Sequence, residues 1–255
     1  MKILVVGGSG LIGSQVIANL TALGHEAASA SPRSGVDTVT GEGLTEAVAG
    51  ADTVVDVSNS PSFDDEPVMH FFTASTRNLL AAERAPGVGH HVALSIVGAD
   101  RTQQSGYMRA KVAQEKLIEE SGRPYSIVRA TQFFEFVDAI ADSATDGNTV
   151  RLPHGAFQPI AAQDVATAVT QAAIEQPLNG IVNIAGPEKS GMDDFIRTRL
   201  AASGDPRQVV TDPAARYFGA EIDEHSIVPL PGENATIYPT RFSDWVAARA
   251  QNTPG

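Results

Sequence analysis

Tyr107 and Lys111 lie four residues apart in the segment YMRAK, a spacing that places both side chains on one face of a helix. An ammonium group beside a phenol lowers the phenol pKa from about 10 by stabilising the phenolate. The sequence therefore predicts a tyrosine that exchanges a proton near neutral pH, as the reduction of a carbonyl oxygen requires.

Carbonyl reduction also needs a second hydrogen-bond donor to hold the reacting oxygen. Ser95 lies near the carboxyl end of the strand expected just before this helix, where ligands of doubly wound sheets bind. Ser105 is an alternative, although its position before Gly106 suits a helix N-cap better.

A glycine-rich turn follows the first apolar run, with glycines at positions 7, 10 and 13. Gly7 permits a tight turn, Gly10 lets a pyrophosphate approach the backbone, and Gly13 lets the following helix pack close to the strand. The position of this turn, between an apolar strand and an amphipathic helix, predicts a dinucleotide site at the helix N-terminus. The expected contacts in the turn are Gly7, Ser9, Gly10, Leu11, Ile12 and Gly13.

The end of the second predicted strand bears on which dinucleotide binds. NAD-binding proteins place a carboxylate there, about 20 residues past the last glycine, to bind the ribose 2′-hydroxyl. Here Ser31, Arg33 and Ser34 stand in that place, and they can bind a phosphate. NADP(H) is therefore favoured over NAD(H), with Asp37 as a competing candidate for the ribose.

Further contacts are expected beyond the ends of two later strands. Asn59 and Ser60 are predicted to lie beside the cofactor, with a simple turn as the equal alternative. Thr131, Gln132 and Phe133 are predicted to line the nicotinamide and substrate side, with Thr131 and Phe133 as cofactor contacts. Phe133 and Phe134 are predicted substrate contacts, and together with Phe136 they form a phenylalanine cluster. At least one phenylalanine of this cluster is expected to belong to the core.

Apolar runs alternate with helix-length amphipathic stretches along the chain, which predicts an α/β fold with a doubly wound parallel sheet. The predicted strands are 3–6, 25–30, 53–57, 91–97 and 125–129, and the predicted helices are 11–23, 66–84, 106–121, 163–175 and 190–202. We interpret residues 1–255 as a single Rossmann-type domain in which roughly 131–250 form a smaller substrate-side lobe, and residues 251–255 as a frayed tail.

Composition excludes several classes of function. The chain has 255 residues, a formal net charge of −12 and zero cysteines. The acidic balance disfavours nucleic acid and anionic membranes as partners, and the missing thiols rule out a disulfide framework or a thiolate metal site. Since no cluster has metal-ligand spacing and no apolar run is long enough to span a bilayer, we expect a soluble cytoplasmic protein, monomeric or homodimeric, without a metal.

Four stretches together resemble the short-chain dehydrogenase/reductase superfamily, in its atypical branch similar to NmrA-like NAD(P)-binding proteins. They are GGSGLIG, ALSIVGAD, YMRAK with the following VAQEKLIEESGRPYSIVRATQF, and QPIAAQDVATAV, within approximately residues 1–185. The resemblance implies a Rossmann fold that binds NAD(P)(H). It also implies that Ser95 orients the carbonyl, that Tyr107 donates the proton, and that Lys111 lowers the tyrosine pKa and holds the nicotinamide ribose hydroxyls.

The helix asparagine that assists a proton relay in active relatives falls near Phe72 in this sequence, and we interpret the nearby Asn78 as a helix-surface or helix-packing residue. Many NmrA-like relatives lack the tyrosine and act as redox sensors, so its presence favours an enzyme.

We therefore expect an NADPH-dependent reductase of a ketone, aldehyde or quinone. The aromatic residues after position 130 suggest a small apolar or aromatic substrate. An NADP(H)-sensing regulatory protein without turnover is the alternative, and an epimerase or dehydratase that keeps its nicotinamide bound is the third possibility.

Overall fold

A parallel sheet of seven strands runs through the protein, in the order β12-β9-β5-β4-β3-β1-β2. The computed structural model from which we describe it covers residues 1–84 and 86–251, so most of the predicted frayed tail lies outside the described residues. The strands are β1 Lys2–Val6, β2 Glu26–Ala30, β3 Thr53–Asp56, β4 His90–Ile96, β5 Tyr125–Ala130, β9 Gly180–Ala185 and β12 Thr236–Ile237. The doubly wound parallel sheet predicted from the sequence is confirmed.

The described chain divides into two compact units. Of the described residues, the first unit comprises those within Met1–Ile96, Gly106–Arg129 and Val165–Val182, and the second comprises those within Val97–Ser105 and Ala130–Asp164 and from Asn183 onward. None of the helices within the described residues is both long and apolar enough to cross a lipid bilayer.

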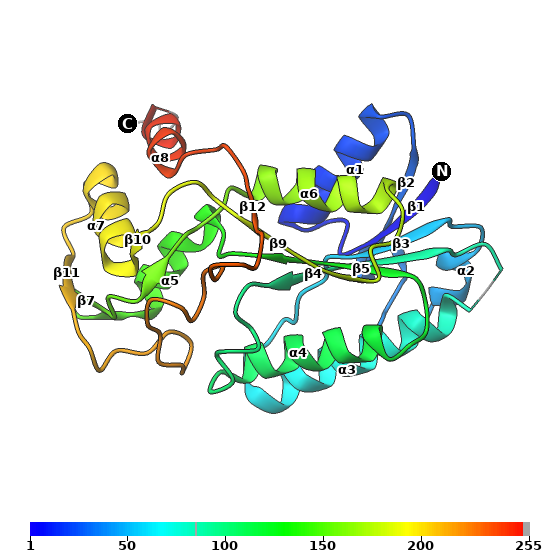
Figure 1. Cartoon of the computed structure of the whole chain (residues 1–255), viewed down its shortest axis with the longest axis horizontal. Helices are drawn as coiled ribbons and strands as arrows, with labels where there is room; N and C mark the ends of the chain where they lie inside the picture. Colours follow the sequence, from blue (N-terminus) through cyan, green and yellow to red (C-terminus); the bar gives the residue numbers. More distant parts are fainter. Residues whose placement is uncertain (85, 252–255) are drawn as a thin grey trace. The chain divides into compact units, whose positions relative to one another are not determined.

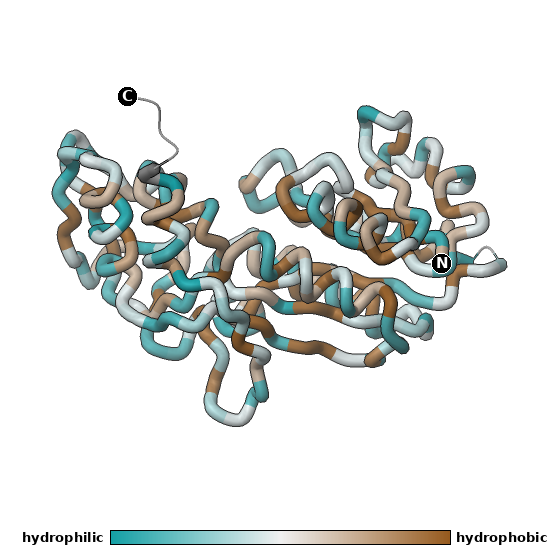
Figure 2. The backbone as a smooth tube through the Cα atoms, turned by 90° about the horizontal axis from the view of Figure 1, so that it is seen from above, coloured by the Kyte–Doolittle hydropathy of each residue, from teal (hydrophilic) through white to brown (hydrophobic). Residues whose placement is uncertain are grey.

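Helices cover both faces of the sheet in the first unit. Figure 1 shows α1 and α6 on one face and α3 and α4 on the other. These helices, with the short α2, are α1 Leu11–Ala22, α2 Leu44–Val48, α3 Asp65–Ala82, α4 Gly106–Glu119 and α6 Ala162–Ile174. Because helices enclose the sheet, β3 is buried at every position. Figure 2 shows the hydrophobic stretches of the backbone in brown.

The strand order reverses between β1 and β3. The chain passes from β1 to β2 on one side and then returns to pair β3 with the other side of β1. In doubly wound sheets the ligand binds beyond the carboxyl ends of the strands at such a switch point. Gly7 and Ser58, which follow these two strands, lie at that place in the first unit.

The second unit contains shorter elements. A three-stranded sheet has the order β11-β7-β6, and β8 pairs with β10 in a separate antiparallel ribbon. The elements are α5 Val137–Ser143, β6 Thr145–Asp146, β7 Thr149–Leu152, β8 Ala156–Phe157, β10 Ser190–Gly191, α7 Met192–Ser203, β11 Gln208–Thr211 and α8 Phe242–Gln251.

Two adjacent buried histidines begin β4 and have opposite environments. The ring of His90 is bonded to the hydroxyl of Ser126 at 2.9 Å, and burial together with His91 lowers the pKa of His90 to about 4. His91 Nδ1 lies 2.7 Å from the carboxylate of Glu83, and both side chains are fully buried. Burial alone would lower the pKa of His91, but the charge and hydrogen bond of Glu83 raise it.

These environments predict a specific pH dependence of stability. Between pH 6.5 and about 4, the unfolded chain binds a proton at His90 that the folded chain does not, so the free energy of unfolding falls as the pH falls. The loss is on the order of 1–3 kcal/mol. His91, whose folded pKa is raised, contributes a constant amount below pH 6.5 and loses its contribution only at higher pH.

Denaturant unfolding from pH 7 to pH 4 measures this effect in the wild type and in His90→Gln. The free energy of unfolding should fall less steeply with falling pH in His90→Gln than in the wild type. His70→Gln, which removes an exposed histidine, should keep the wild-type dependence on pH. An unchanged slope in His90→Gln would contradict this account of the histidine pair.

Candidate functional site

The glycine turn after β1 is packed so tightly that it excludes side chains. Gly7 adopts φ +79°, and a Cβ there would lie 2.9 Å from the backbone of Ser58 after β3. A Cβ on Gly13 would collide with the carbonyl oxygen of Gly7, so α1 can approach β1 only because this position is glycine. Gly10 is the N-cap of α1, and no side chain caps the first turn of this helix.

The other predicted residues of the turn differ in their exposure to solvent. Ser9 and Leu11 are exposed, whereas Ile12 is buried against the core of the first unit. The exposed residues and the uncapped helix N-terminus leave backbone N–H groups available for an anion.

A short helical turn, Pro32–Ser34, follows β2 and presents Arg33. The Ser34 hydroxyl accepts the N–H of Ser31 at 2.9 Å, and the Ser31 side chain accepts the N–H of Ser34. The capping interaction uses Ser31 as an acceptor and leaves its hydroxyl proton free to donate. Arg33 is exposed. The competing carboxylate of Asp37 accepts two backbone N–H groups, from Val39 and Thr40, in its own turn.

Tyr107 in the first turn of α4 donates a hydrogen bond to Asn59 Oδ1 at 3.0 Å. Its ring packs on Phe63 and Phe72, with centroid distances of 5.3 Å and 5.8 Å. Burial raises the pKa of Tyr107 above its ordinary value, which is opposite to the lowering expected from the Tyr-x-x-x-Lys spacing. The spacing gave the wrong direction because it contains no information about how deeply the phenol is buried.

Lys111, one turn further along α4, is directed into the protein. Its Nζ donates to the carbonyl of Leu94 at 2.8 Å and to Gln114 Oε1, and lies 4.4 Å from the centroid of Phe72. Gln114 in turn donates to Asp56 Oδ2 at 2.9 Å. Burial lowers the pKa of Lys111 to about 8, although Asp56 and Glu115 act in the opposite direction.

Ser95 is next to the Leu94 carbonyl to which Lys111 is bonded. The side chain is 3% exposed, and its Oγ has no hydrogen-bond partner among the described residues. A buried hydroxyl without a partner is unusual, because burying an unpaired polar group is costly. Ser105, the alternative, is also buried, and its backbone N–H bonds to Thr102.

Asn59 and Ser60 after β3 form a turn and also contact the tyrosine. Asn59 Oδ1 accepts the N–H of Ser60 at 3.0 Å in addition to the Tyr107 hydroxyl, and Ser60 Oγ accepts the N–H of Ser62. Asn59 is exposed and Ser60 is buried. Asn78 donates to the carbonyls of Thr38 and Val39, so its interpretation as a packing residue is confirmed.

In the second unit, the residues after β5 divide into core and accessible positions. Phe134 is 1% exposed and packs on Phe242 and Trp245, so it belongs to the core, where a substrate cannot reach it without repacking. Phe133 is half-buried and stacks on the exposed Phe136. Thr131 is buried, and its hydroxyl has no partner among the described residues.

Residues 7–176 match the family described as NAD(P)H-binding. The match begins at the glycine turn and extends through the tyrosine helix to the end of α6. The chain belongs to this NAD(P)H-binding family.

Similar proteins include a reductase, an assembly factor and an epimerase. The chain is 32% identical over 126 residues to a divinyl chlorophyllide a 8-vinyl-reductase of Cucumis sativus, a match that covers 46% of this chain but 30% of the relative's length. It is 25% identical over 234 residues to the photosystem II assembly factor Ycf39 of Synechocystis sp., covering 84% of this chain and 72% of that protein. Among solved structures, UDP-glucose 4-epimerase of Thermus thermophilus in complex with NAD is similar with a TM-score of 0.71 at 22% identity, covering 89% of this chain and 91% of the epimerase.

The geometry fits the cofactor that the family binds. The turn at Gly7 and Gly13 has no room for side chains, and the first turn of α1 is uncapped at the switch point of the sheet. The buried Ser95 hydroxyl is near the end of β4, the strand beside β3, and has no protein partner among the described residues. These features suit a dinucleotide with its phosphates at α1.

A separate cavity of about 670 Å³ lies in the second unit and contains none of the predicted site residues. Its lining includes charged side chains, those of Arg101, Glu221 and Asp223, beside amide and proline side chains.

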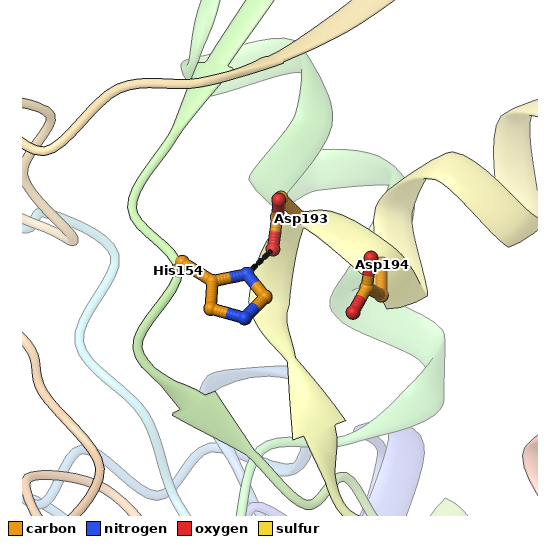
Figure 3. Close-up of side chains that lie close together, drawn as sticks. All are labelled: His154, Asp193 and Asp194. Carbon is orange, nitrogen blue, oxygen red and sulfur yellow. Dashed lines mark hydrogen bonds and ion pairs between the residues drawn. The ribbon is translucent and has the colours of Figure 1, made fainter.

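The second unit also brings together His154, Asp193 and Asp194, whose potential metal-ligand atoms lie within 4.8 Å of one another. Figure 3 shows His154 Nδ1 bonded to Asp193, at 2.7 Å. Arg197 pairs with both carboxylates, at 3.4 Å and 2.7 Å. Burial alone would raise the pKa of Asp193, but hydrogen bonds from Thr211 and His154 lower it. Arg197 offsets one of the two negative charges, and these ion pairs hold the two aspartates in the first turn of α7.

Sequence reasoning missed two of the relevant contacts. Gln114 follows Lys111 by three residues, a helical spacing that could have indicated the contact. No sequence signal identifies Asn59 as the partner of Tyr107, because 48 residues separate them.

The glycine turn gives a test that does not depend on catalysis. A Cβ on Gly10 would approach only the carbonyl oxygen of Gly7, at 3.2 Å, so Gly10→Ala should fold with a small local shift. The added methyl group would occupy space where a pyrophosphate approaches the backbone, and we expect NADPH affinity to fall about tenfold or more. Fluorescence titration with NADPH measures this.

Gly180→Ala is the matched control, since a Cβ there meets Leu178 O at an ordinary 3.8 Å. Equal NADPH affinities in the two variants would show that the phosphates do not bind at this turn.

Proposed function

We propose that this protein is an NADPH-dependent oxidoreductase that reduces the carbonyl group of a small ketone, aldehyde or quinone, with Tyr107 as the proton donor. The observation that carries the proposal is the buried hydroxyl of Ser95, which has no hydrogen-bond partner among the described residues. It lies at the end of β4, next to the carbonyl that Lys111 binds. A carbonyl oxygen of a substrate would supply the missing acceptor.

Tyr107 is in the protonation state that a proton donor needs. Its pKa is raised by burial, so the phenol carries its proton at neutral pH. The hydroxyl already donates to Asn59, an exposed amide at the end of β3, and a substrate oxygen would replace that acceptor. Bound NADPH would supply the hydride for the carbonyl carbon, and Tyr107 would supply the proton for the carbonyl oxygen.

Lys111 acts as a positioning residue in this proposal. Its bond to the Leu94 carbonyl and its contact with Gln114 connect α4 to the ends of β4 and, through Asp56, of β3. The helix that carries Tyr107 is thereby held at the same strand ends where Ser95 lies. The ribose-binding role that the resemblance implies would require one ammonium proton to be turned toward the cofactor.

The proposed cofactor preference rests on Arg33 and Ser31. Arg33 is exposed beyond the end of β2, and the Ser31 hydroxyl keeps a proton to donate. Both groups suit a phosphate on the adenosine ribose, and Asp37 is held in its own turn. An apolar or aromatic substrate is supported by the stacked pair Phe133 and Phe136, of which Phe136 is 46% exposed.

A second candidate function is cofactor sensing without turnover. It is favoured by the similarity to a protein that is named as an assembly factor and not as a reductase. In that case the bond between Tyr107 and Asn59 would be structural, and the two redox forms of the cofactor would bind with different affinities.

The Tyr107→Phe variant distinguishes the two functions. Removing the hydroxyl should lower NADPH consumption by about 100-fold or more, because Tyr107 is the proposed proton donor, while NADPH affinity stays nearly constant. The assay is NADPH consumption over a panel of aldehydes, ketones and quinones, with Tyr125→Phe on β5 as the matched tyrosine control. Turnover that survives in Tyr107→Phe would refute the tyrosine role, and binding without turnover in the wild type would favour the sensor.

The Arg33→Gln variant tests the cofactor preference. Loss of the guanidinium should weaken NADPH binding about tenfold and leave NADH binding unchanged, because only NADPH carries the 2′-phosphate. Titrations with both nucleotides measure this, and Arg77→Gln, which removes an exposed arginine on α3, is the control. Equal losses for both nucleotides would assign Arg33 to another part of the cofactor.

A further inference from the structure

Gln132, two residues past β5, carries a buried carboxamide without protein partners. The residue is 8% exposed, and among the described residues neither its Nε2 nor its Oε1 has a hydrogen-bond partner. The adjacent Thr131 is 1% exposed, and its hydroxyl is also without a partner there. Three unpaired polar atoms therefore lie on two successive buried residues of the second unit.

Such an arrangement is costly for a protein that has no ligand to pair with it. Each buried polar atom left unpaired costs on the order of 1–3 kcal/mol, and native proteins contain few of them. Gln158 shows the ordinary outcome in the same unit, since its Nε2 donates to the carbonyl of Gly186 at 2.8 Å. The difference between the two glutamines indicates that the partner of Gln132 is not part of the protein.

The backbone around Gln132 is fixed, so the side chain cannot simply turn to solvent with its loop. The Gln132 carbonyl accepts the N–H of Ile160 at 2.9 Å, and the Ile160 carbonyl accepts the N–H of Phe134 at 2.9 Å. On the other side, the N–H of Thr131 donates to Ile184 in β9 at 3.1 Å. The backbone that carries the carboxamide is thus fixed before any ligand arrives, which lowers the entropic cost of binding.

We propose that Gln132 is a recognition residue for an amide-type edge, a planar group that presents a hydrogen-bond acceptor next to a donor. Nε2 donates to the carbonyl oxygen of that group, and Oε1 accepts its N–H. The Thr131 hydroxyl, on the neighbouring residue, is a further donor or acceptor for the same ligand. Two sources have this chemistry: the nicotinamide carboxamide of the cofactor, and an amide, lactam or imide in the substrate.

The cofactor source rests on membership of the NAD(P)H-binding family, and the substrate source rests on the proposed reductase function. The experiments can contradict one source without contradicting the other, because cofactor affinity is measured without turnover. Loss of the Tyr107 role would remove the reductase proposal and leave the cofactor measurement valid.

The first experiment compares NADPH with its reduced 3-acetylpyridine analogue, which keeps the carbonyl oxygen and replaces the amide nitrogen by a methyl group. If Gln132 binds the nicotinamide, the wild type should bind NADPH about tenfold more tightly than the analogue. Gln132→Met should weaken NADPH binding by about the same factor and abolish the discrimination, since the donor then has no acceptor. Gln132→Leu serves if Gln132→Met does not fold.

The second experiment uses pairs of reducible carbonyl compounds that differ only in an amide or an ester group. If the substrate supplies the edge, Gln132→Met should leave NADPH affinity unchanged and raise the KM for the amide member of each pair by about tenfold, with little change in kcat. The KM for the ester member should hardly change.

Thermal stability of the ligand-free protein provides a third readout. Gln132→Met removes two unpaired buried polar atoms and should raise the Tm. Gln158→Met removes the hydrogen bond to the carbonyl of Gly186 and should lower the Tm. The proposal is overturned if Gln132→Met lowers the Tm and also leaves the cofactor discrimination and both KM values at wild-type levels. In that case Gln132 is a packing residue.

Discussion

The buried charge of Lys111 determines how the helix α4 is attached to the sheet. Lys111 is 3% exposed, so its ammonium group must have polar partners, because leaving it unpaired in the interior would cost several kcal/mol. The partners come from the strand ends: the Leu94 carbonyl in β4, and Asp56 in β3 through Gln114. Asp56 is in turn bonded to the hydroxyl and N–H of Ser58. This chain of bonds fixes the register of α4 against β3 and β4, and with it the position of Tyr107.

Two other buried polar side chains follow the opposite rule. Ser95 and Gln132 are buried with polar atoms that have no partner among the described residues. A fold optimised for stability alone would replace such groups with apolar ones of the same size. Their presence suggests that stability has been reduced at these positions in favour of binding, which is the usual balance at functional sites.

The sequence predicted strands β1 to β5 and helices α1, α3, α4 and α6 within a few residues because their signals are local, whereas the short α2 and the strand β9 were not predicted. The apolar run of β1, the glycine turn and the amphipathic α1 each depend on neighbouring residues only. The short strands of the second unit were not predicted, because two-residue elements such as β8 and β10 have no periodicity to detect. Pairings over long sequence distances, such as His154 with Asp193, were also not predicted.

The Tyr107 pKa shows a different limit of sequence reasoning. Spacing correctly placed the tyrosine and lysine on one helix, but the direction of a pKa shift depends on which atoms surround each group in three dimensions. Phe63 and Phe72 pack against the phenol, and Leu94 and Gln114 take up the ammonium. The two phenylalanines belong to a distant part of the chain, so the environment of the phenol could not be read from the motif itself.

The shortness of β12 has a consequence for how the protein behaves at high concentration. Exposed sheet edges are templates on which strands of other molecules can pair and aggregate. One edge of the seven-stranded sheet consists of only two residues, Thr236–Ile237, and the other is β2, which carries the exposed Glu26 at its start. One edge therefore offers few free backbone groups and the other begins with a charge, so the large sheet is poorly suited to growing by addition of strands from neighbouring chains.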